Sequence, residues 1–189
     1  MVATDGIVAS PDEEGGVIMG AGIYPRNGDG MTRAIPVRGE IASMLPEGAA
    51  IEYALANFPK NEPLAIVTDC AVMLYFIEAI TRDTFWKSYD KHRFETLLAR
   101  VATALQGRES HMLFIKVEAH QGQEMNEAAD YMANKGTTNP DHDPMEYGMN
   151  KRYMAAEVRI SDARQDRDDV MMVTRGCQGA APPYKICTD

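Results

Sequence analysis

Two short apolar runs with helix-like sequence between them limit the folds open to this chain more than any other feature. Residues 64–68 and 112–117 are largely apolar segments, as expected of strands that are buried on both faces of a sheet. Helical periodicity extends from about residue 71 to 82 and from about 91 to 105. Strands that alternate with helices in this way indicate an α/β fold with helices packed on the sheet.

The first forty residues predict a different arrangement, a meander of three strands. Residues 2–8 and 17–24 are apolar, and turn-forming residues separate them. Asn27-Gly28-Asp29-Gly30 is a strong turn signal, after which residues 31–37 can return as a third strand. A helix is predicted over residues 46–57, with Pro46 at its opening. The whole is therefore a mixed sheet with helices packed on it.

The domain is predicted to end near residue 136. Residues 137–189 contain the turn-rich Asn139-Pro-Asp-His-Asp-Pro stretch and a highly charged segment over 161–169. Residues 146–160 could form a helix, but the composition as a whole favours a poorly packed extension or linker that is disordered in part. We therefore predict a domain over 1–136 and a C-terminal extension or linker over 137–189.

Charge and cysteine usage limit the function and the compartment. A net charge of −9 argues against a protein that holds nucleic acid through charge alone, but not against an enzyme whose bound cations supply positive charge. Three cysteines (70, 177 and 187) match no zinc motif and favour free thiols in a reducing compartment. The sequence contains no apolar run long enough to span a bilayer, and its first residues form neither a basic n-region nor an apolar h-region. We therefore expect an intracellular protein, in the cytoplasm or nucleus, with no membrane partner.

The segment from His120 to Asp130 is the clearest candidate for a functional site. Apolar residues at positions 125, 128, 129, 132 and 133 follow the spacing of a half-buried helix. Asn126 and Asp130 are four residues apart, so both side chains can reach one point beside the apolar stripe. His120 precedes them on a loop that contains Gly122. These groups suggest a metal-dependent hydrolytic site, and the alternative is an amphipathic helix with a solvated polar face.

Three more acidic residues stand where the local structure disfavours them. Asp5 interrupts an apolar strand, Asp69 ends the first buried run, and Glu47 shares a helix face with apolar residues. Glu52, in contrast, is expected on the polar face of that helix. Ordinary explanations exist: a turn or bulge for Asp5, an N-cap for Asp69 and a favourable helix-start charge for Glu47. If these acids converge with Asp130, the all-oxygen cluster suits Mg²⁺ or Mn²⁺, and two such ions can promote phosphodiester cleavage.

These residues together resemble the ribonuclease H domain, type 1, of the kind associated with retroelement reverse transcriptases. The matching motifs are Thr4-Asp5-Gly6, Glu47 followed by Ala50, Ala54 and Leu55, Thr68-Asp69-Cys70, and Ala119-His120-x-Gly122-x-x-x-Asn126-Glu127-x-Ala129-Asp130. The resemblance covers residues 1–136. It implies an α/β, ribonuclease H-like fold, in which a five-stranded mixed sheet combines the antiparallel meander with parallel strands and carries helices on both faces.

The resemblance also implies an activity, the endonucleolytic cleavage of the RNA strand of RNA–DNA hybrids. Two Mg²⁺ ions, for which Mn²⁺ can substitute, would be bound by four carboxylates: Asp5, Glu47, Asp69 and Asp130. His120 would be the mobile catalytic histidine. Hybrid selectivity would come from contacts to RNA 2′-hydroxyl groups. The matching positions for substrate contacts are Gly6, Ser43, Met44, Cys70 and Asn126.

Some residues depart from the family pattern. Cys70 stands where the family often has Ser, and Trp86, Lys87 and Lys91 are at most a remnant of a basic substrate handle. This predicts weak hybrid binding by the isolated domain and favours a linkage, covalent or not, to a reverse transcriptase. A free-standing cellular or viral enzyme is the alternative to such a linkage. Two alternatives stay open: a catalytically silent ribonuclease H-like connector of a larger polyprotein, and another nuclease or a transposase on the same fold.

Overall fold

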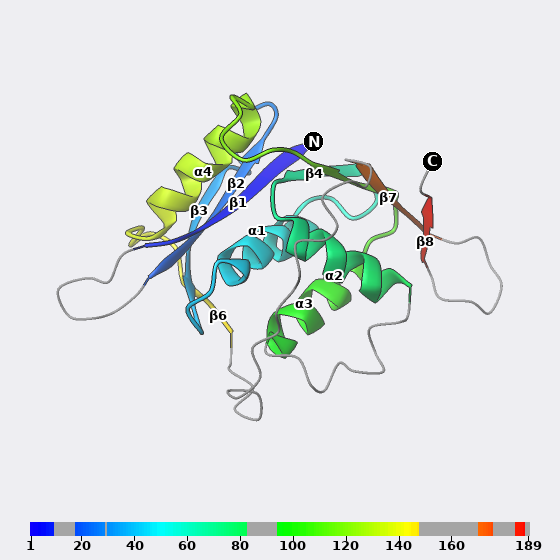
Figure 1. The fold of residues 1–189 in the computed structure, drawn as a ribbon, viewed down its shortest axis with the longest axis horizontal. Coiled ribbons are helices and arrows are strands. Elements are labelled where there is room, and N and C mark those ends of the chain that lie inside the picture. Colours follow the sequence, from blue (N-terminus) through cyan, green and yellow to red (C-terminus); the bar gives the residue numbers. More distant parts are fainter. Residues whose placement is uncertain (10–17, 29, 83–93, 148–169, 176–183, 188–189) are drawn as a thin grey trace.

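One mixed β-sheet organises the protein. The computed structural model describes residues 1–9, 18–28, 30–82 and 94–147, and the backbone of 170–175 and 184–187. Within these residues eight strands form one sheet in the order β6-β3-β2-β1-β4-β5-β7-β8 (Figure 1). The strands are β1 (Val2–Val8), β2 (Met19–Pro25), β3 (Arg33–Arg38), β4 (Leu64–Thr68), β5 (Met112–Lys116), β6 (Met145–Glu146), β7 (Val170–Arg175) and β8 (Tyr184–Cys187).

Four helices in the described part of the chain cover the two faces of this sheet. They are α1 (Met44–Asn57), α2 (Ala71–Thr81), α3 (Glu95–Gln106) and α4 (Glu124–Gly136). The first three lie together on one face, whereas α4 lies on the other, against β1, β2 and β3 (Figure 1). The predicted placement of helices on both faces is confirmed. None of these helices is both long and apolar enough to cross a membrane.

The strand pairing contains the predicted meander and the predicted parallel strands. Strand β2 pairs antiparallel with β1 and β3, and β4 pairs parallel with β1 and β5. The predicted count of five strands is too low, because β6 pairs with β3, and β7 and β8 extend the sheet beyond β5. Strand β6 has two residues, too few for an alternating pattern, and it begins just before the helix predicted over 146–160. Residues 148–160 of that predicted helix lie outside the described residues.

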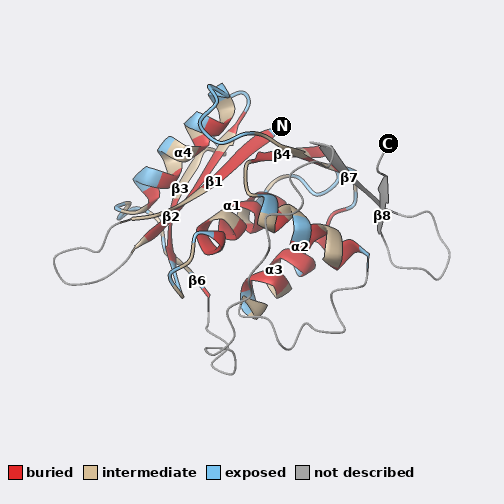
Figure 2. Ribbon diagram, in the orientation of Figure 1, coloured by how far each residue is buried: buried red, intermediate tan, exposed pale blue. Residues whose placement is uncertain are grey.

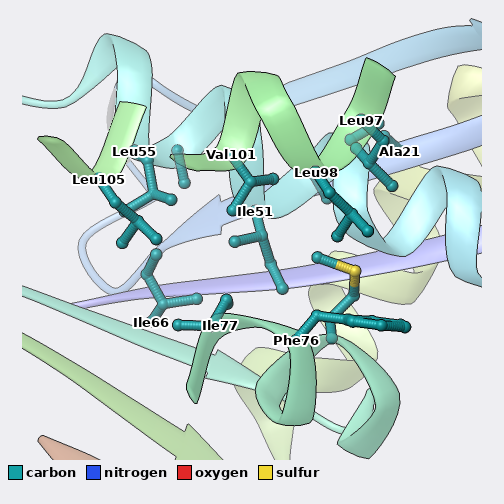
Figure 3. Close-up of a cluster of buried hydrophobic side chains, with 14 of the residues drawn as sticks. Ala21, Ile51, Leu55, Ile66, Phe76, Ile77, Leu97, Leu98, Val101 and Leu105 are labelled. Atoms are coloured by element: carbon teal, nitrogen blue, oxygen red, sulfur yellow. The ribbon is translucent and has the colours of Figure 1, made fainter. Parts of the chain in front are cut away.

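The face covered by α1, α2 and α3 holds the main apolar core. Met19, Ala21 and Ile23 of β2 alternate along the strand and are fully buried on this side. The three helices carry stripes of buried residues (Figure 2), and large aliphatic and aromatic side chains from them pack against the sheet, as the close-up in Figure 3 shows. They include Ile51, Leu55, Phe76, Ile77, Leu97, Leu98, Val101 and Leu105.

The opposite face has a much smaller apolar core. Its buried members are Ala3, Val67 and Ala129. The buried residues of α4 are Asn126, Ala129, Ala133 and Gly136, which are mostly small. The apolar residues at positions 125, 128 and 132, predicted to share the buried stripe, are only half-buried. Helix α4 therefore contacts the sheet through a narrower surface than its apolar periodicity predicts.

Residues 139–147 lie against the domain, contrary to the prediction of a poorly packed extension from residue 137. Asn139 Nδ2 donates to Ala34 O at 2.5 Å, and Tyr147 N donates to Arg38 O at 3.0 Å. The Tyr147 side chain is 5% exposed and belongs to the main core. The prediction failed because the turn-rich composition of this segment gives no sign that one aromatic residue, Tyr147, is buried in the core. The domain boundary at residue 136 itself stays a prediction.

Glu52 is buried, so its predicted place on the polar face of α1 is wrong. Its side chain is 7% exposed, and its Oε2 accepts a hydrogen bond of 2.6 Å from the Tyr147 hydroxyl. Arg100 Nη2 lies 3.1 Å from both carboxylate oxygens, and the guanidinium carbon is 4.8 Å from the centroid of the Tyr147 ring. Burial and the Glu52 charge both raise the pKa of Tyr147, which keeps its hydroxyl a donor. These donors compensate the burial of the carboxylate.

Candidate active site

The central strands β1 and β4 place two of the predicted acids side by side. The parallel register pairs Ala3 with Val67. Asp5 and Asp69 each come two residues later in the chain, so their side chains lie next to each other on the same face of the sheet. Asp5 is 6% exposed, and its Oδ1 accepts a hydrogen bond of 2.6 Å from Gly6 N. The Asp in the apolar strand is thus neither a turn residue nor a bulge residue, because β1 is continuous across it.

Gly6 allows the third acid to approach. A Cβ atom on Gly6 would lie 2.1 Å from Glu47 N and 2.4 Å from Pro46 C, so a larger residue could not occupy this position. The first turn of α1 therefore lies directly on the backbone of β1, and it brings Glu47 beside Asp5. Glu47 Oε2 is buried and has no hydrogen-bond partner among the described residues.

Asp69 follows the last residue of β4 and does not act as a helix cap. The N-cap of α2 is Cys70, and no side-chain hydrogen bond caps this helix. The turn is made by Thr68, whose Oγ1 accepts from Cys70 N at 3.2 Å. The Asp69 carboxylate instead accepts a hydrogen bond of 3.2 Å from Asn126 Nδ2 of α4. The N-cap explanation of Asp69 is therefore wrong.

Asp5, Glu47 and Asp69 form one cluster. Each offers a carboxylate oxygen, and these three oxygens all lie within 4.8 Å of one another. Burial, followed by the Asp69 charge, raises the pKa of Asp5 to about 7. Burial, followed by the charges of Asp5 and Asp69, raises the pKa of Glu47 to about 9. Without a cation the cluster therefore retains protons near neutral pH, as expected when like charges share a buried site.

Asp130, the fourth predicted acid, is not a member of this cluster. It lies on α4, half-buried, and its Oδ1 accepts a hydrogen bond of 3.3 Å from Asn134 Nδ2. It is close enough for its charge to contribute to the raised pKa values of Asp5 and Glu47. The structure therefore brings three carboxylates together and holds the fourth at their margin.

His120 lies on the exposed loop between β5 and α4. Its backbone φ is 54°, a left-handed conformation that is uncommon for residues other than glycine, and Gly122 has a φ of 74°. The ring forms no hydrogen bond or ion pair with the described residues and is exposed to solvent. The predicted place of His120 on a loop next to the helix is confirmed by this geometry, whereas its catalytic role stays a prediction.

The predicted substrate-contact positions differ in what they offer. Ser43 is the exposed N-cap residue of α1 and makes no side-chain cap hydrogen bond. The Met44 side chain is buried in the main core, so only its backbone could reach a ligand. Burial, followed by the Glu47 charge, raises the pKa of Cys70 to about 12, so this residue stays a neutral thiol.

Asn126 belongs to the carboxylate site more directly than the sequence indicated. It is 4% exposed and, besides its hydrogen bond to Asp69, its Oδ1 has no partner among the described residues. Gly20 and Gly22 of β2, which the sequence reasoning missed, lie beneath the same helix. The alternation of Gly-x-Gly in an apolar strand was the available signal, because it places both glycines on one face.

The donor set fits a hard divalent cation. Carboxylate oxygens are the ligands that Mg²⁺ and Mn²⁺ prefer, and such a cation would satisfy the buried Glu47 oxygen that none of the described residues contacts through a hydrogen bond. A cation would also remove the repulsion that raises the pKa values of Asp5 and Glu47.

An α/β fold of this topology, with a carboxylate cluster on β1, on α1 and directly after β4, defines a ribonuclease H-like protein. The RNase H family model matches residues 1–138, and the chain belongs to this family. The resemblance inferred from the sequence motifs is thus confirmed.

Solved structures resemble the chain in fold. The foamy viral protease-reverse transcriptase, solved in complex with dsDNA, is similar over 72% of this chain and 92% of its own, with a TM-score of 0.56 and 21% sequence identity. At this identity the likeness concerns the fold alone. No curated protein matches the chain.

Proposed function

We propose that the protein is a metal-dependent endonuclease that cleaves the RNA strand of RNA–DNA hybrids. The observation that carries this proposal is the cluster of Asp5, Glu47 and Asp69, with ligand oxygens within 4.8 Å and one buried Glu47 oxygen that has no partner in the described part of the chain. Such a cluster costs folding free energy unless a cation binds it. Membership of the RNase H family supports a nuclease rather than a structural use of this cation.

Asp5, Glu47 and Asp69 would hold Mg²⁺, with Asp130 completing the site for a second ion, and Mn²⁺ can substitute. A pair of bound ions supplies an activated water and stabilises the leaving oxygen in phosphodiester hydrolysis. The protein contributes the arrangement of the ligands: Gly6 lets Glu47 reach Asp5, and Asn126 orients Asp69 through its hydrogen bond.

The other predicted residues act on the substrate. His120, exposed on its loop, offers an imidazole that can accept and release a proton near the scissile bond. The backbone near Gly6 and Met44 and the exposed hydroxyl of Ser43 surround the opening of α1, where RNA 2′-hydroxyl groups would distinguish a hybrid from DNA. The neutral Cys70 thiol is a weak donor at the same place.

The proposed partner is an RNA–DNA hybrid presented by a linked reverse transcriptase. A net charge of −9 disfavours tight hybrid binding by this chain alone, because phosphate contacts need basic groups. The similar foamy viral protein contains a protease and a reverse transcriptase. This association of domains supports the same kind of linkage for this chain. An intracellular location stays a prediction.

The proposal is tested by a cleavage assay with three labelled substrates: an RNA–DNA hybrid, double-stranded RNA and double-stranded DNA. We expect Mg²⁺-dependent cuts in the RNA of the hybrid only, and none by Asp69→Asn, which keeps the size of the side chain but loses its charge. An uncut hybrid, beside an active reference enzyme, would refute the nuclease. Cleavage of DNA alone would assign the protein to another nuclease class, and calorimetric Mg²⁺ binding without cleavage would favour a silent connector.

A further inference from the structure

Helix α4 carries both Asn126 and Asp130, and it can lie close to the sheet only because two residues of β2 beneath it are glycines. A Cβ on Gly22 would lie 1.9 Å from Ala129 O and 2.4 Å from Ala133 N. A Cβ on Gly20 would lie 1.9 Å from Ala133 O. The atoms met are backbone atoms inside a helix, so they cannot move without moving the helix.

We propose that Gly20 and Gly22 are positioning residues of the active site. By leaving the surface of β2 bare, they let α4 lie close enough to the sheet for Asn126 to hold Asp69 and for Asp130 to face Asp5 and Glu47. This inference rests on the proposed function, since it concerns the carboxylates that would bind Mg²⁺.

The contact that depends on this depth is the hydrogen bond between Asn126 and Asp69. Its length of 3.2 Å is at the long end of the ordinary range, so an outward shift of α4 by about 1 Å breaks it. Asn126 and Ala129 are both on the buried stripe of α4, one helical turn apart. A shift forced at Ala129 therefore reaches Asn126 almost undiminished, and Asp130, the next residue after Ala129, moves with it.

Asn126 is itself poorly placed for a purely structural role. It is 4% exposed and its Oδ1 has no partner among the described residues, so the amide is desolvated for a single hydrogen bond. An apolar residue would pack against the sheet without this cost. A role of the amide in orienting the Asp69 carboxylate explains why a buried Asn occupies position 126.

Gly136 provides a matched control at the far end of the same helix. A Cβ there would lie 2.7 Å from Ile35 O and 2.9 Å from Ile35 N. A larger residue at this position would therefore also push α4 outward, in this case away from the backbone of β3. Gly136 is ten residues beyond Asn126, which corresponds to about 15 Å along the helix. Ala133, the neighbour of Gly20, lies between the two, at about 10 Å.

The experiment compares Gly22→Ala, Gly20→Ala and Gly136→Ala in the full chain. Mg²⁺ binding is measured by calorimetry and by the Mg²⁺-induced rise in Tm, and kcat and KM are measured with the hybrid. For Gly22→Ala we expect Mg²⁺ affinity to fall about tenfold or more and kcat to fall about 100-fold, with KM nearly unchanged. Gly20→Ala should lie between, and Gly136→Ala should lose stability while Mg²⁺ affinity and kcat stay at the wild-type level.

A different ranking would overturn the inference: equal effects of the three substitutions on Mg²⁺ binding, or a Gly22→Ala protein that binds Mg²⁺ like the wild type. If Gly22→Ala does not fold, Asn126→Ala removes the amide and leaves the depth of α4 unchanged, and wild-type Mg²⁺ affinity in that variant would overturn the inference as well. A wild-type protein that neither binds Mg²⁺ nor cuts the hybrid would instead refute the proposed function.

Discussion

The two faces of the sheet differ in the side chains that pack on them. On the face of α1, α2 and α3, large side chains such as Leu98 and Phe76 fill a continuous apolar core. On the face of α4, the apolar core is small, and glycines of β2 lie under helix backbone. The first face gains stability from burial. The second face gains short distances between backbones, and these bring polar groups of α4 close to Asp5 of β1 and to Asp69 at the end of β4.

The difference teaches that stability and the candidate site lie largely on separate parts of this fold. Glu47 Oε2 and Asn126 Oδ1 are buried without a partner among the described residues, and burial together with neighbouring charges raises the pKa values of Asp5 and Glu47. The free-energy costs of such groups concentrate at functional sites, because the rest of the structure can bear them.

The largest expected effect comes from Glu47→Gln, which separates the contribution of this residue to activity from its contribution to stability. We expect cleavage of the hybrid to fall about 1000-fold, equivalent to roughly 4 kcal/mol of transition-state stabilisation. At about pH 8 the metal-free variant should melt at a higher temperature than the wild type, because folding no longer forces protonation of an acid whose pKa is raised to about 9. Cleavage rates measured with Mg²⁺ check the predicted fall in activity, and melting curves recorded without Mg²⁺ check the predicted rise in Tm. A lower Tm for the variant would show that Glu47 contributes to stability.

Leu98→Ala should give the opposite pattern on the main core. Leu98 is fully buried among α3 and its neighbours, so we expect a loss of about 3 kcal/mol in the free energy of unfolding. Cleavage per folded molecule should stay at the wild-type level. Urea denaturation combined with the cleavage assay measures both quantities, and a loss of cleavage per folded molecule would show that the two faces are not separable.

A third prediction concerns pH. Because folding raises the pKa of Asp5 from 3.8 to about 7 and that of Glu47 from 4.5 to about 9, the folded metal-free protein binds more protons than the unfolded chain in this range. This contribution to stability is present below about pH 4 and is lost as the pH rises through the two raised values. Between about pH 5 and pH 8 the Tm should fall by roughly 5–10 °C. Mg²⁺ should recover most of the loss, and Glu47→Gln should flatten the profile; a metal-free Tm that rises with pH would contradict the assignment.

The smallest expected effect is that of Tyr147→Phe, which removes one donor from buried Glu52. We expect a loss of about 1.5 kcal/mol in the free energy of unfolding, because Arg100 still pairs with the carboxylate. Tyr131→Phe, the same change at a side chain that is 56% exposed, is the control and should stay within about 0.5 kcal/mol of the wild type. Equal effects of the two substitutions would show that the Tyr147 hydroxyl contributes nothing to the fold.

The sequence could predict elements whose signal is local. Strands β1, β4 and β5 and helices α1 and α2 begin and end within about two residues of the predicted bounds, because the period of apolar residues is a property of each segment. The grouping of Asp5, Glu47 and Asp69 could also be anticipated, since each acid stands in a position that its own segment disfavours.

Features that depend on distant partners could not be predicted in this way. Glu52 looks like a surface residue on an isolated helix, and only Arg100 and Tyr147, from other parts of the chain, make its burial possible. Strand β6 exists because β3 offers a free edge, not because its two residues favour a strand. The hydrogen bond of Asn126 to Asp69 similarly depends on how deeply α4 lies, which no helical period encodes.

The link between Glu52 and Tyr147 has a consequence for synthesis on the ribosome. The two residues are 95 positions apart, so the hydroxyl that completes the burial of Glu52 emerges long after α1. Until residue 147 has left the exit tunnel, the nascent chain can collapse around α1, but its carboxylate lacks one of its two donors. We therefore expect the main core to become stable only late in translation, since loops of this length close last.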